Sequence, residues 1–446
     1  MNSYRIFIIL LAIVYLSSCR KRDKNECPVC PVVETVSPAS GHAGDTITIN
    51  GRQFNSTGNI VKINNVVAEV ISENSGQVRA KVPRNCGSGP VSVDIDDELT
   101  SNRSVSFNYI FKYTVTTFAG TPLFFGDADG AAATAKFNSP KGIVSDKLGN
   151  VYVADRNNNC IRKIKAGQVT TFAGTKGPTG GFANSANPLT AQFNFPYGID
   201  INKSNELFVA DLFNDCIRKI LPSGAVSTIA GTGTVPGDVD GIGTAAKFNW
   251  PTDVAIFQDS ILFIADYLNN KIKRVSANGR TVTLAGTGIK GNLNGSLSTA
   301  TFFGPLGLTM FDNTSLLIVD NGNVELRGVN FANSMASTFA GTGSIGAFND
   351  RSTSSTFNYP TDVAIRMIDG KREIYVADQS NNVIRLIDGN GNVSTIIGDG
   401  TPGFKNAEGV QALLNKPYGL AFDALDNNIL YITDEANHCI RKVVIE

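Results

Sequence analysis

One motif recurs six times along this chain and limits the folds that it can adopt. Its first copy, residues 150–164, reads NVYVADRNNNCIRKI, and later copies include LFVADLFNDCIRKI, IYVADQSNNVIRLI and LYITDEANHCIRKV. The Asp that ends each apolar run recurs at Asp155, Asp211, Asp266, Asp320, Asp378 and Asp434, with separations of 56, 55, 54, 58 and 56 residues. A regular period of this kind indicates one supersecondary unit that is used repeatedly.

Each repeat alternates between short β-branched runs and polar turns. A Pro-x-Gly-apolar run precedes the Asp run, as at residues 140–143, and a VTTFAG-type run follows the basic run, as at residues 169–174. Short runs of this composition, separated by turn residues, are typical of β-strands. Four strands per unit, six units and no helical period predict an all-β fold with a six-bladed β-propeller.

The two ends of the repeat region predict how the ring closes. The chain stops after the third strand of the sixth unit, and an additional VTTFAG-type run, residues 114–119, precedes the first unit. We predict that residues 114–119 pair with residues 440–445 as the outer strand of the sixth blade. This pairing would cover a strand edge that is otherwise open to aggregation.

The N-terminus carries the features of an export signal. Arg5 precedes eleven apolar residues, 6–16, whereas a membrane-spanning helix needs about 20. The following Leu16-Ser17-Ser18-Cys19 resembles a bacterial lipobox. That resemblance implies a signal peptide over residues 1–18, lipid attachment at Cys19, a tether over residues 19–31 and a protein anchored in the outer membrane at the cell surface. Arg20, rather than Asp, follows the cysteine, so the inner-membrane retention signal of lipoproteins is absent.

Residues 32–110 break the period and form a separate predicted domain. Apolar runs at residues 46–49, 60–63, 66–70, 78–82, 91–95 and 105–109 predict a small β-sandwich. The segments VSPASGHAGDTITINGRQF and VPRNCGSGPVSVDI resemble the immunoglobulin-like IPT/TIG family. That resemblance implies a spacer or a partner-binding module. The chain has 39 Lys and Arg against 39 Asp and Glu, so it lacks the basic surface expected for nucleic-acid binding.

Residues 111–446 resemble NHL repeats, with the P-x-G-I, VYVAD and IRKI segments present in five copies. The fourth copy departs from this pattern, because residues 321–325, NGNVE, replace the usual turn and Gly328 stands where the first copy has Lys163, which predicts a distorted fourth blade. NHL propellers include lyases, sensors, scaffolds and polymer binders. The resemblance therefore implies a fold but does not by itself assign a function.

The cysteines fall into two groups. Cys27 and Cys30 have no second Cys or His pair at zinc spacing, and we expect either a local disulfide or a bond to Cys86 in an oxidising compartment. Cys160, Cys216 and Cys439 occupy one repeat position in separate blades. Equivalent atoms of neighbouring blades lie too far apart for a disulfide at this position, so we expect small buried apolar side chains.

Two polar positions follow each repeat Asp at fixed spacing. An Asn lies three residues later and a base seven residues later, as at Asn158 and Arg162. A ring of ligand groups is one interpretation, but an asymmetric ligand has no use for six identical contacts. We favour a structural role, in which the Asn forms the turn and the carboxylate pairs with the base.

Position in the fold predicts the binding face. The connections between units, such as residues 120–140, are long and emerge beside the Asp-x-x-Asn turns, whereas the turns on the opposite face are short. Aromatic residues flank the Pro at the end of several long connections: Phe195, Tyr197, Trp250, Tyr359 and Tyr418. These rings could form a rim that stacks on sugars. Alternatively, they cover the blade core.

Three carboxylates are expected near the central channel. Asp253 and Asp362 replace the Gly after Pro-x, and Asp200 stands where other repeats have small residues or Thr. Together they could hold Ca²⁺ through oxygen ligands; the alternative is local hydrogen bonding. The Asp-x-Asp-Gly segments that start at Asp127 and Asp238 lack the Glu of a calcium loop and are interpreted as turns.

Catalysis finds little support in the sequence. The chain has two His, His42 and His438, which excludes a three-His zinc site within one chain, and no nucleophile has a recognisable base partner. The layout resembles surface glycan-binding lipoproteins of Gram-negative polysaccharide uptake, which implies a non-catalytic protein with a polysaccharide ligand. The alternatives are a scaffold of a cell-envelope complex and a metal-dependent lactonase-like or lyase-like enzyme.

Overall fold

The computed structural model describes residues 30–95, 99–102, 105–368 and 370–446. The chain divides into two compact units, one that runs to Lys112 and includes Glu446, and one that spans Tyr113–Ile445. The predicted signal peptide, Cys19 and Cys27 lie outside the described residues. Cys30 is disulfide-bonded. In the described part of the chain, no helix is both long and apolar enough to span a membrane.

The first unit consists of short strands that pair in the order β1-β3-β6-β5-β4-β7-β9-β2, with β8 beside β7. The strands are β1 (Val32–Ser37), β2 (Ser40–Gly41), β3 (Thr46–Arg52), β4 (Ile60–Ile63), β5 (Val66–Asn74), β6 (Gln77–Lys81), β7 (Gly89–Ile95), β8 (Leu99–Thr100) and β9 (Ser106–Tyr109). Alternate residues of these strands, such as Ile47, Ile49, Val78 and Val91, form one buried core. Each of the six predicted runs overlaps a strand, whereas β1, β2 and β8 were not predicted.

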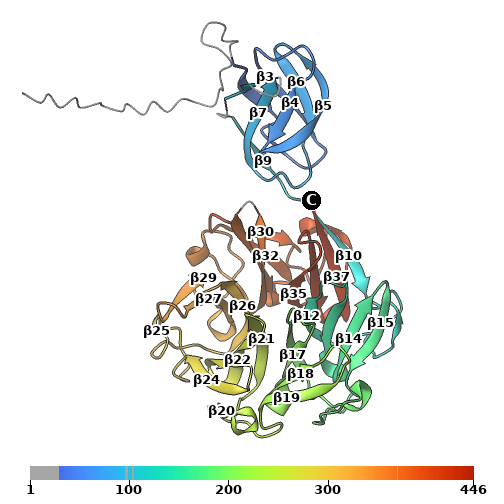
Figure 1. Ribbon diagram of the computed structural model, residues 1–446, viewed down its shortest axis with the longest axis vertical. Helices are drawn as coiled ribbons and strands as arrows, with labels where there is room; N and C mark the ends of the chain where they lie inside the picture. The colour runs from blue at the N-terminus through green and yellow to red at the C-terminus, as the bar shows by residue number, and fades with distance from the viewer. Residues whose placement is uncertain (1–29, 96–98, 103–104, 369) are drawn as a thin grey trace, which may run out of the picture. The chain divides into compact units, whose positions relative to one another are not determined.

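The second unit is a six-bladed propeller, as predicted, with its sheets arranged around a centre in Figure 1. Blades are numbered here by the order of the repeat Asp. Each inner strand begins at a Pro, which lacks a backbone donor and is tolerated at the first strand position. The inner strands are β12 (Pro140–Ser145), β16 (Pro196–Ile201), β21 (Pro251–Phe257), β26 (Pro305–Asp312), β30 (Pro360–Ile368) and β35 (Pro417–Phe422).

The second strands end at the repeat Asp: β13 (Val151–Asp155), β17 (Leu207–Asp211), β22 (Ile261–Asp266), β27 (Ser315–Asp320), β31 (Lys371–Asp378) and β36 (Ile429–Asp434). A one-turn 3₁₀ helix follows each of them: η2 (Arg156–Asn158), η4 (Leu212–Asn214), η6 (Tyr267–Asn269), η7 (Asn321–Asn323), η9 (Gln379–Asn381) and η11 (Glu435–Asn437). The third strands are β14 (Cys160–Lys165), β18 (Cys216–Ile220), β23 (Lys271–Val275), β28 (Glu325–Asn330), β32 (Val383–Ile387) and β37 (Cys439–Ile445).

The fourth strands are β15 (Gln168–Ala173), β19 (Val226–Gly231), β24 (Arg280–Ala285), β29 (Met335–Ala340), β33 (Val393–Ile397) and β10 (Tyr113–Ala119). Four blades carry a further two-residue edge strand: β11 (Gly130–Ala131), β20 (Gly241–Ile242), β25 (Gly295–Ser296) and β34 (Ala407–Glu408). The connections also contain η3 (Pro188–Thr190), η5 (Gly243–Ala245), η8 (Ser352–Ser354) and η10 (Gly409–Gln411). Apolar side chains pack between neighbouring blades, as Phe263 of blade three and Ile318 of blade four do.

The predicted ring closure is confirmed. Strand β10 pairs antiparallel with β37, from Tyr113 opposite Ile445 to Ala119 opposite Ile440. In Figure 1 the cyan β10 lies beside the red β37, so the two ends of the propeller segment share the sixth blade. The blade is therefore completed by strands from opposite ends of the segment, and the ring has no open strand at its junction.

The repeated Asp, Asn and base form a buried network in five of the six blades. In blade one, Asp155 accepts hydrogen bonds from Asn158 and Arg162, each at 2.8 Å, and from the backbone N–H of Asn138 at 2.8 Å. All six repeat Asp residues are fully buried. Burial raises the pKa of Asp155 to about 6, although the guanidinium of Arg162 opposes that rise. The predicted pairing of carboxylate and base is confirmed in these five blades, whereas Lys273 of blade three bonds to Asp238 and Asp240 instead of Asp266.

The same base holds the long connection that leads into its blade. The Nη2 of Arg162 donates to Asp129 at 2.6 Å and to the carbonyl of Ala128 at 2.9 Å. The equivalent side-chain acceptors in blades two to six are Asn184, Asp240, Asn294, Asn349 and Asn406. The buried base therefore anchors the long connection through two of the Asp-x-Asp-Gly segments, residues 127–130 in blade one and residues 238–241 in blade three. This role agrees with their interpretation as turns.

The remaining structural predictions for the repeats have mixed outcomes. Cys160, Cys216 and Cys439 are buried free thiols, as predicted. The distortion predicted at the turn of blade four is not found, because β27 and β28 pair without a break from Ser315 opposite Asn330 to Asp320 opposite Glu325. Gly328 lies within this ladder, where the backbone hydrogen bonds do not depend on its side chain. The blade instead has a second register shift between β26 and β27, at Met310 and Asp312, which the described residues of the other blades lack.

Neighbouring blades are linked through the residue that ends each 3₁₀ turn in a left-handed conformation. Asn270, with φ of 52°, accepts the backbone N–H of Gly304 in the next blade at 3.0 Å. Asn159, Asp215, Asn382 and His438 make the equivalent bond with a side-chain oxygen or ring nitrogen. Val324, with φ of 56°, takes this position in blade four and has no side-chain acceptor.

We predict that Asn270→Ala destabilises the protein more than Val324→Ala does, although valine is the larger apolar residue. Asn270→Ala removes the link to Gly304 and leaves an alanine in a left-handed conformation, at a cost of roughly 2 kcal/mol. Val324→Ala loses two methyl groups but relieves a strained β-branched residue, at a cost of about 1 kcal/mol. Urea unfolding measures both. The opposite order would contradict the inter-blade link.

We also predict that Lys273→Arg stabilises blade three. The Nζ of Lys273 bonds to Asp238 and Asp240 and makes no bond to Asp266, and burial raises the pKa of Asp266 to about 7. An arginine can reach Asp266 as it does in the other blades, lowering that pKa and adding roughly 1 kcal/mol.

The pH dependence of Lys273→Arg provides the check. A carboxyl whose pKa is raised in the folded state lowers stability as pH rises, so the gain is largest above about pH 7 and is lost below about pH 4. Unfolding curves of both proteins across this range measure the gain. A gain that is independent of pH would contradict the explanation.

Candidate functional site

A cavity of about 290 Å³ lies on the long-loop face, where all six blades contribute to its wall. We call it the mouth cavity. One set of lining residues follows the Pro of each inner strand: Lys141, Tyr197, Thr252, Leu306, Thr361 and Tyr418. A second set follows the repeat Asp in five of the six blades: Arg156, Leu212, Tyr267, Asn321 and Gln379. Phe213, Trp250 and Tyr359 complete the lining.

The predicted aromatic residues lie at different depths. Trp250 and Tyr359 are 40% and 45% exposed, whereas Tyr418 is 6% exposed. Tyr197 meets the Tyr418 ring edge-to-face, with 5.4 Å between ring centroids. The structure therefore brings four of the five predicted residues to the mouth cavity, with Trp250 and Tyr359 at its rim.

Phe195, the fifth predicted residue, is half-buried and does not line the mouth cavity. Its ring packs 4.7 Å from that of Phe213, and the ring of Phe213 lies 5.3 Å from that of Trp250. Phe195 therefore supports the rim through Phe213.

The exposed rim aromatics occupy strained backbone positions. The residue before each inner-strand Pro has a positive φ, which is 56° at Trp250, 50° at Tyr359 and 60° at the equivalent Gly304. Glycine adopts this region freely, whereas a bulky residue there is a conformational outlier. Large rings at strained and exposed positions are more consistent with a binding role than with a contribution to stability.

The floor of the mouth cavity carries a buried ion pair. Lys141 is 4% exposed, and its Nζ lies 2.8 Å from the carboxylate of Glu435 and 3.7 Å above the centroid of the Tyr418 ring. Burial lowers the pKa of Lys141 to about 8, a shift that Glu435 opposes and that the cations of Arg156 and Lys416 reinforce. Gln379 also donates to Glu435, at 2.8 Å.

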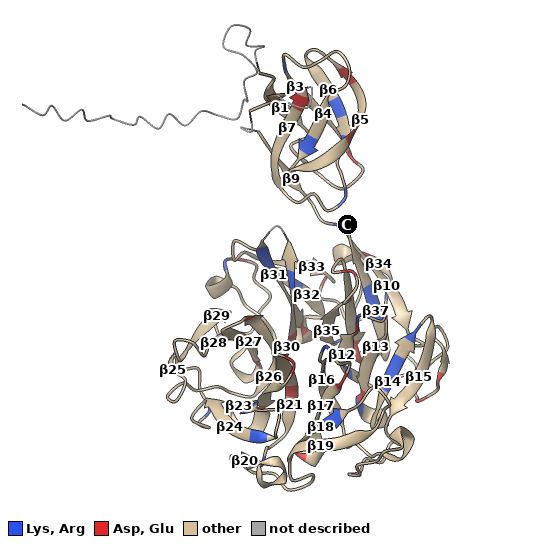
Figure 2. Cartoon of the chain, viewed as in Figure 1, with Lys and Arg blue, Asp and Glu red and all other residues tan. Residues whose placement is uncertain are grey.

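Asp200, Asp253 and Asp362 line a separate cavity of about 240 Å³ between the inner strands. Each carboxylate accepts a backbone N–H from a neighbouring blade: Asp200 from Ile256, Asp253 from Leu308 and Asp362 from Leu420. Figure 2 shows these acidic segments on the inner strands, whereas the third strands carry basic ones.

Burial raises the pKa of Asp200 to about 6 and that of Asp362 to about 7. Within the described ranges, no group of three His, Cys, Asp or Glu is arranged to hold a metal ion. The hydrogen bonds of the three carboxylates join adjacent blades.

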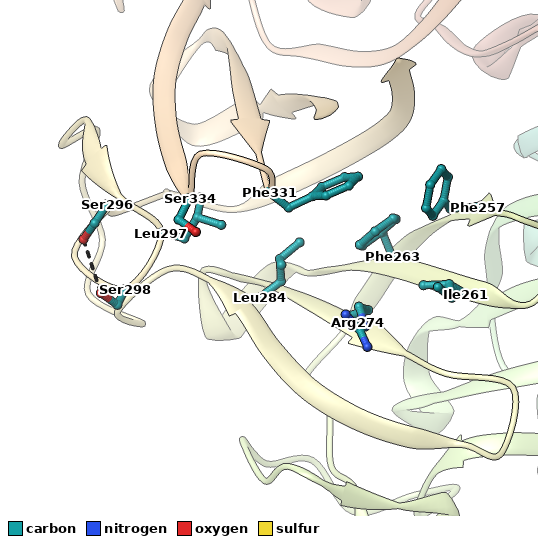
Figure 3. Close-up of a pocket in the computed structure, with 10 residues that line it drawn as sticks. All are labelled: Phe257, Ile261, Phe263, Arg274, Leu284, Ser296, Leu297, Ser298, Phe331 and Ser334. Atoms are coloured by element: carbon teal, nitrogen blue, oxygen red, sulfur yellow. Dashed lines mark hydrogen bonds between the residues drawn. The ribbon is translucent and has the colours of Figure 1, made fainter. Parts of the chain in front are cut away.

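A cavity of about 460 Å³ lies between blades three and four. Figure 3 shows the rings of Phe257, Phe263 and Phe331 gathered at one end and Ser296 and Ser298 at the other. The Phe263 and Phe331 rings are stacked, with 5.5 Å between their centroids. The wall is largely apolar, and it has fewer convergent polar groups than the mouth cavity.

Sequence reasoning missed the residues directly after the repeat Asp. Their variability was the available signal, since Arg156, Leu212, Tyr267, Asn321, Gln379 and Glu435 differ while the neighbouring Asp does not. Each opens a 3₁₀ turn on the long-loop face. A varied residue beside an unvaried anchor can change the ligand surface while the anchor keeps the backbone in place.

Comparison with known families accounts for both units. Residues 31–111 match the IPT/TIG domain family, and residues 124–330 match the Teneurin NHL domain family. The chain joins a TIG domain to an NHL-type propeller. The chloroplastic protein SUPPRESSOR OF QUENCHING 1 of Arabidopsis thaliana is 30% identical over 336 residues, which cover 71% of this chain and 31% of that protein. This chain therefore spans about a third of the length of that relative.

Two solved structures share the fold of the TIG and NHL-type units along most of the chain. One, a protein of unknown function from Bacteroides thetaiotaomicron, is 19% identical with a TM-score of 0.60 and covers 95% of this chain and 99% of its own. The other is described as an auxiliary nutrient binding protein from Bacteroides ovatus. It is 18% identical with a TM-score of 0.57 and covers 93% of this chain and 98% of its own. At these identities the likeness shows the fold alone.

We predict that Trp250→Gly changes the free energy of unfolding by less than about 1 kcal/mol, because relief of the positive φ offsets the lost contact with Phe213. Phe248→Ala is the matched control, since Phe248 lies in the same connection and is fully buried, and its cost is about 3–5 kcal/mol. Urea unfolding measures both. A cost for Trp250→Gly equal to that of Phe248→Ala would identify Trp250 as a packing residue.

Proposed function

We propose that this protein is a non-catalytic binding protein that takes a polysaccharide at the mouth cavity of its NHL-type propeller. The observation that carries this proposal is the pair of exposed rings, Trp250 and Tyr359, held in strained conformations at the rim of a cavity lined by all six blades. The TIG domain then serves as a spacer. Lipid attachment at Cys19 and a place on the outer membrane surface belong to the same proposal.

The chemistry of the lining supports a carbohydrate ligand. Flat indole and phenol rings suit the apolar faces of sugar rings, and their polar tips can bond to hydroxyl groups. Asn321, Gln379 and Tyr267 add side-chain donors and acceptors around the same cavity. Few polar groups at fixed positions in a concave aromatic site are typical of small-ligand and oligomer recognition.

The auxiliary nutrient binding protein from Bacteroides ovatus supports the broader class, since its name describes binding rather than catalysis. A nutrient-binding role accords with an exported protein that carries a lipid anchor. The narrower claim, that the ligand is a polysaccharide, rests on the rim aromatics.

Affinity electrophoresis through gels that contain different polysaccharides tests the proposal. We expect at least one polymer to retard the wild-type protein. Trp250→Ala combined with Tyr359→Ala removes both rim rings and should weaken binding by about 2 kcal/mol or more, as the loss of aromatic anchors does at other interfaces.

Phe348→Ala is the control for these variants. Phe348 is 61% exposed and lies in a long connection but does not line the mouth cavity, so its loss should leave the retardation unchanged. Equal retardation of the double variant and the wild type would indicate that the ligand binds away from the rim. Absence of retardation by every polymer would contradict polysaccharide binding.

A further inference from the structure

Arg156, which is half-buried, differs from the fully buried cations of the propeller. Arg162, Lys141 and Arg366 pair with Asp155, Glu435 and Glu373 at 2.8, 2.8 and 2.6 Å. The guanidinium of Arg156 makes no hydrogen bond or ion pair with any residue that the structure describes, and its Nε is buried without a partner. The Nε of Arg162 also lacks a partner, but both of its terminal nitrogens are bonded.

The guanidinium of Arg156 is nonetheless held in place. It lies 4.6 Å from the centroid of the Phe195 ring and 5.8 Å from that of Tyr197, and Arg156 lines the mouth cavity. Stacking of this kind orients the planar group and leaves the N–H donors of its two terminal nitrogens available. A charge removed from water normally acquires a partner of opposite sign.

The charges around the mouth cavity leave this cation uncompensated. Glu435 is the acidic group that faces the floor, and its carboxylate is already engaged by Lys141 and Gln379. The lowered pKa of Lys141 has burial as its main cause, and the positive charge of Arg156 contributes to it. The mouth cavity therefore has a net positive charge on the side of blades one and six.

We propose that Arg156 binds an anionic substituent of the glycan, so that the ligand is an acidic polysaccharide that bears carboxylate or sulfate groups. The guanidinium presents parallel N–H donors that match either group in a two-bond arrangement. Trp250 and Tyr359 then stack on the sugar ring, while Arg156 selects its charge. This inference rests on the proposed polysaccharide function and adds the ligand class.

The binding of an anionic substituent by Arg156 can be tested by affinity electrophoresis with pairs of polymers, in which one member carries the charged group and the other does not. Polygalacturonate is compared with its methyl ester, and dextran sulfate with dextran, so that the two pairs distinguish a carboxylate from a sulfate. We expect retardation by the charged member of at least one pair, weakened by added salt. Arg156→Met keeps an apolar chain over Phe195 and should weaken that binding about ten- to hundredfold.

Arg274→Met is the matched control. Arg274 is exposed and lines the cavity between blades three and four, so its replacement removes the same charge at a different site and should leave retardation unchanged. Thermal unfolding of both variants checks that each is folded. Arg156→Lys retains the charge but not the parallel N–H donors of the guanidinium. Its affinity for the charged polymer should lie between those of the wild type and Arg156→Met.

The outcomes separate the two proposals. Retardation by neutral polymers that is undiminished in Arg156→Met would overturn the inference and leave polysaccharide binding intact. Loss of acidic-polymer binding in Arg274→Met but not in Arg156→Met would place the anion in the cavity of Figure 3 and also overturn it. Absence of retardation by all four polymers and by the wider polysaccharide panel would overturn the proposed function, and the inference with it.

Discussion

The buried pairing of a repeat Asp with the base seven residues later is the interaction on which the propeller depends. Arg162 joins Asp155 at the end of β13 to Asp129 in the long connection, so one side chain fixes the second strand, its turn and the entry of the chain into the blade. Removal of either partner would leave a charge in a site without water, which is strongly destabilising. The Asn that is the last residue of each 3₁₀ turn bonds to the same carboxylate. The long-loop face is therefore positioned by residues that do not line the mouth cavity.

This arrangement separates residues that maintain the fold from residues that vary with position. The Asp is fully buried in every blade, while the residue directly after it points into the mouth cavity in five blades. The Pro of each inner strand likewise stays constant, and the residues on either side of it change from blade to blade. A ring with six-fold repetition can thus present an asymmetric surface, with aromatic rings on blades two, three, five and six and an uncompensated cation on blade one.

Much of the fold could be predicted from the sequence because periodicity depends on local chemistry. The spacing of the Asp residues defined six blades, and the orphan run at residues 114–119 predicted its pairing with β37. The depth at which each aromatic side chain lies in the mouth cavity could not be predicted in this way. Tyr418 and Tyr359 both flank a Pro, yet one follows it into the inner strand and is buried, whereas the other precedes it and is exposed. Arg156 was missed because its significance lies in the absence of a described acceptor around it, and only the packing of Phe195, Tyr197 and Glu435 reveals that.

The central claim is that ligand binds over the rim of the mouth cavity, and Trp250 provides a direct reporter because it is the chain's single tryptophan. A titration of the protein with a polysaccharide that retards it, followed by intrinsic tryptophan fluorescence and in parallel by calorimetry, measures binding and the surroundings of Trp250 together. The account predicts a saturable change in the emission of Trp250 with the same midpoint as the heat of binding. Binding heat without any change in that emission would place the ligand elsewhere on the protein and contradict the account.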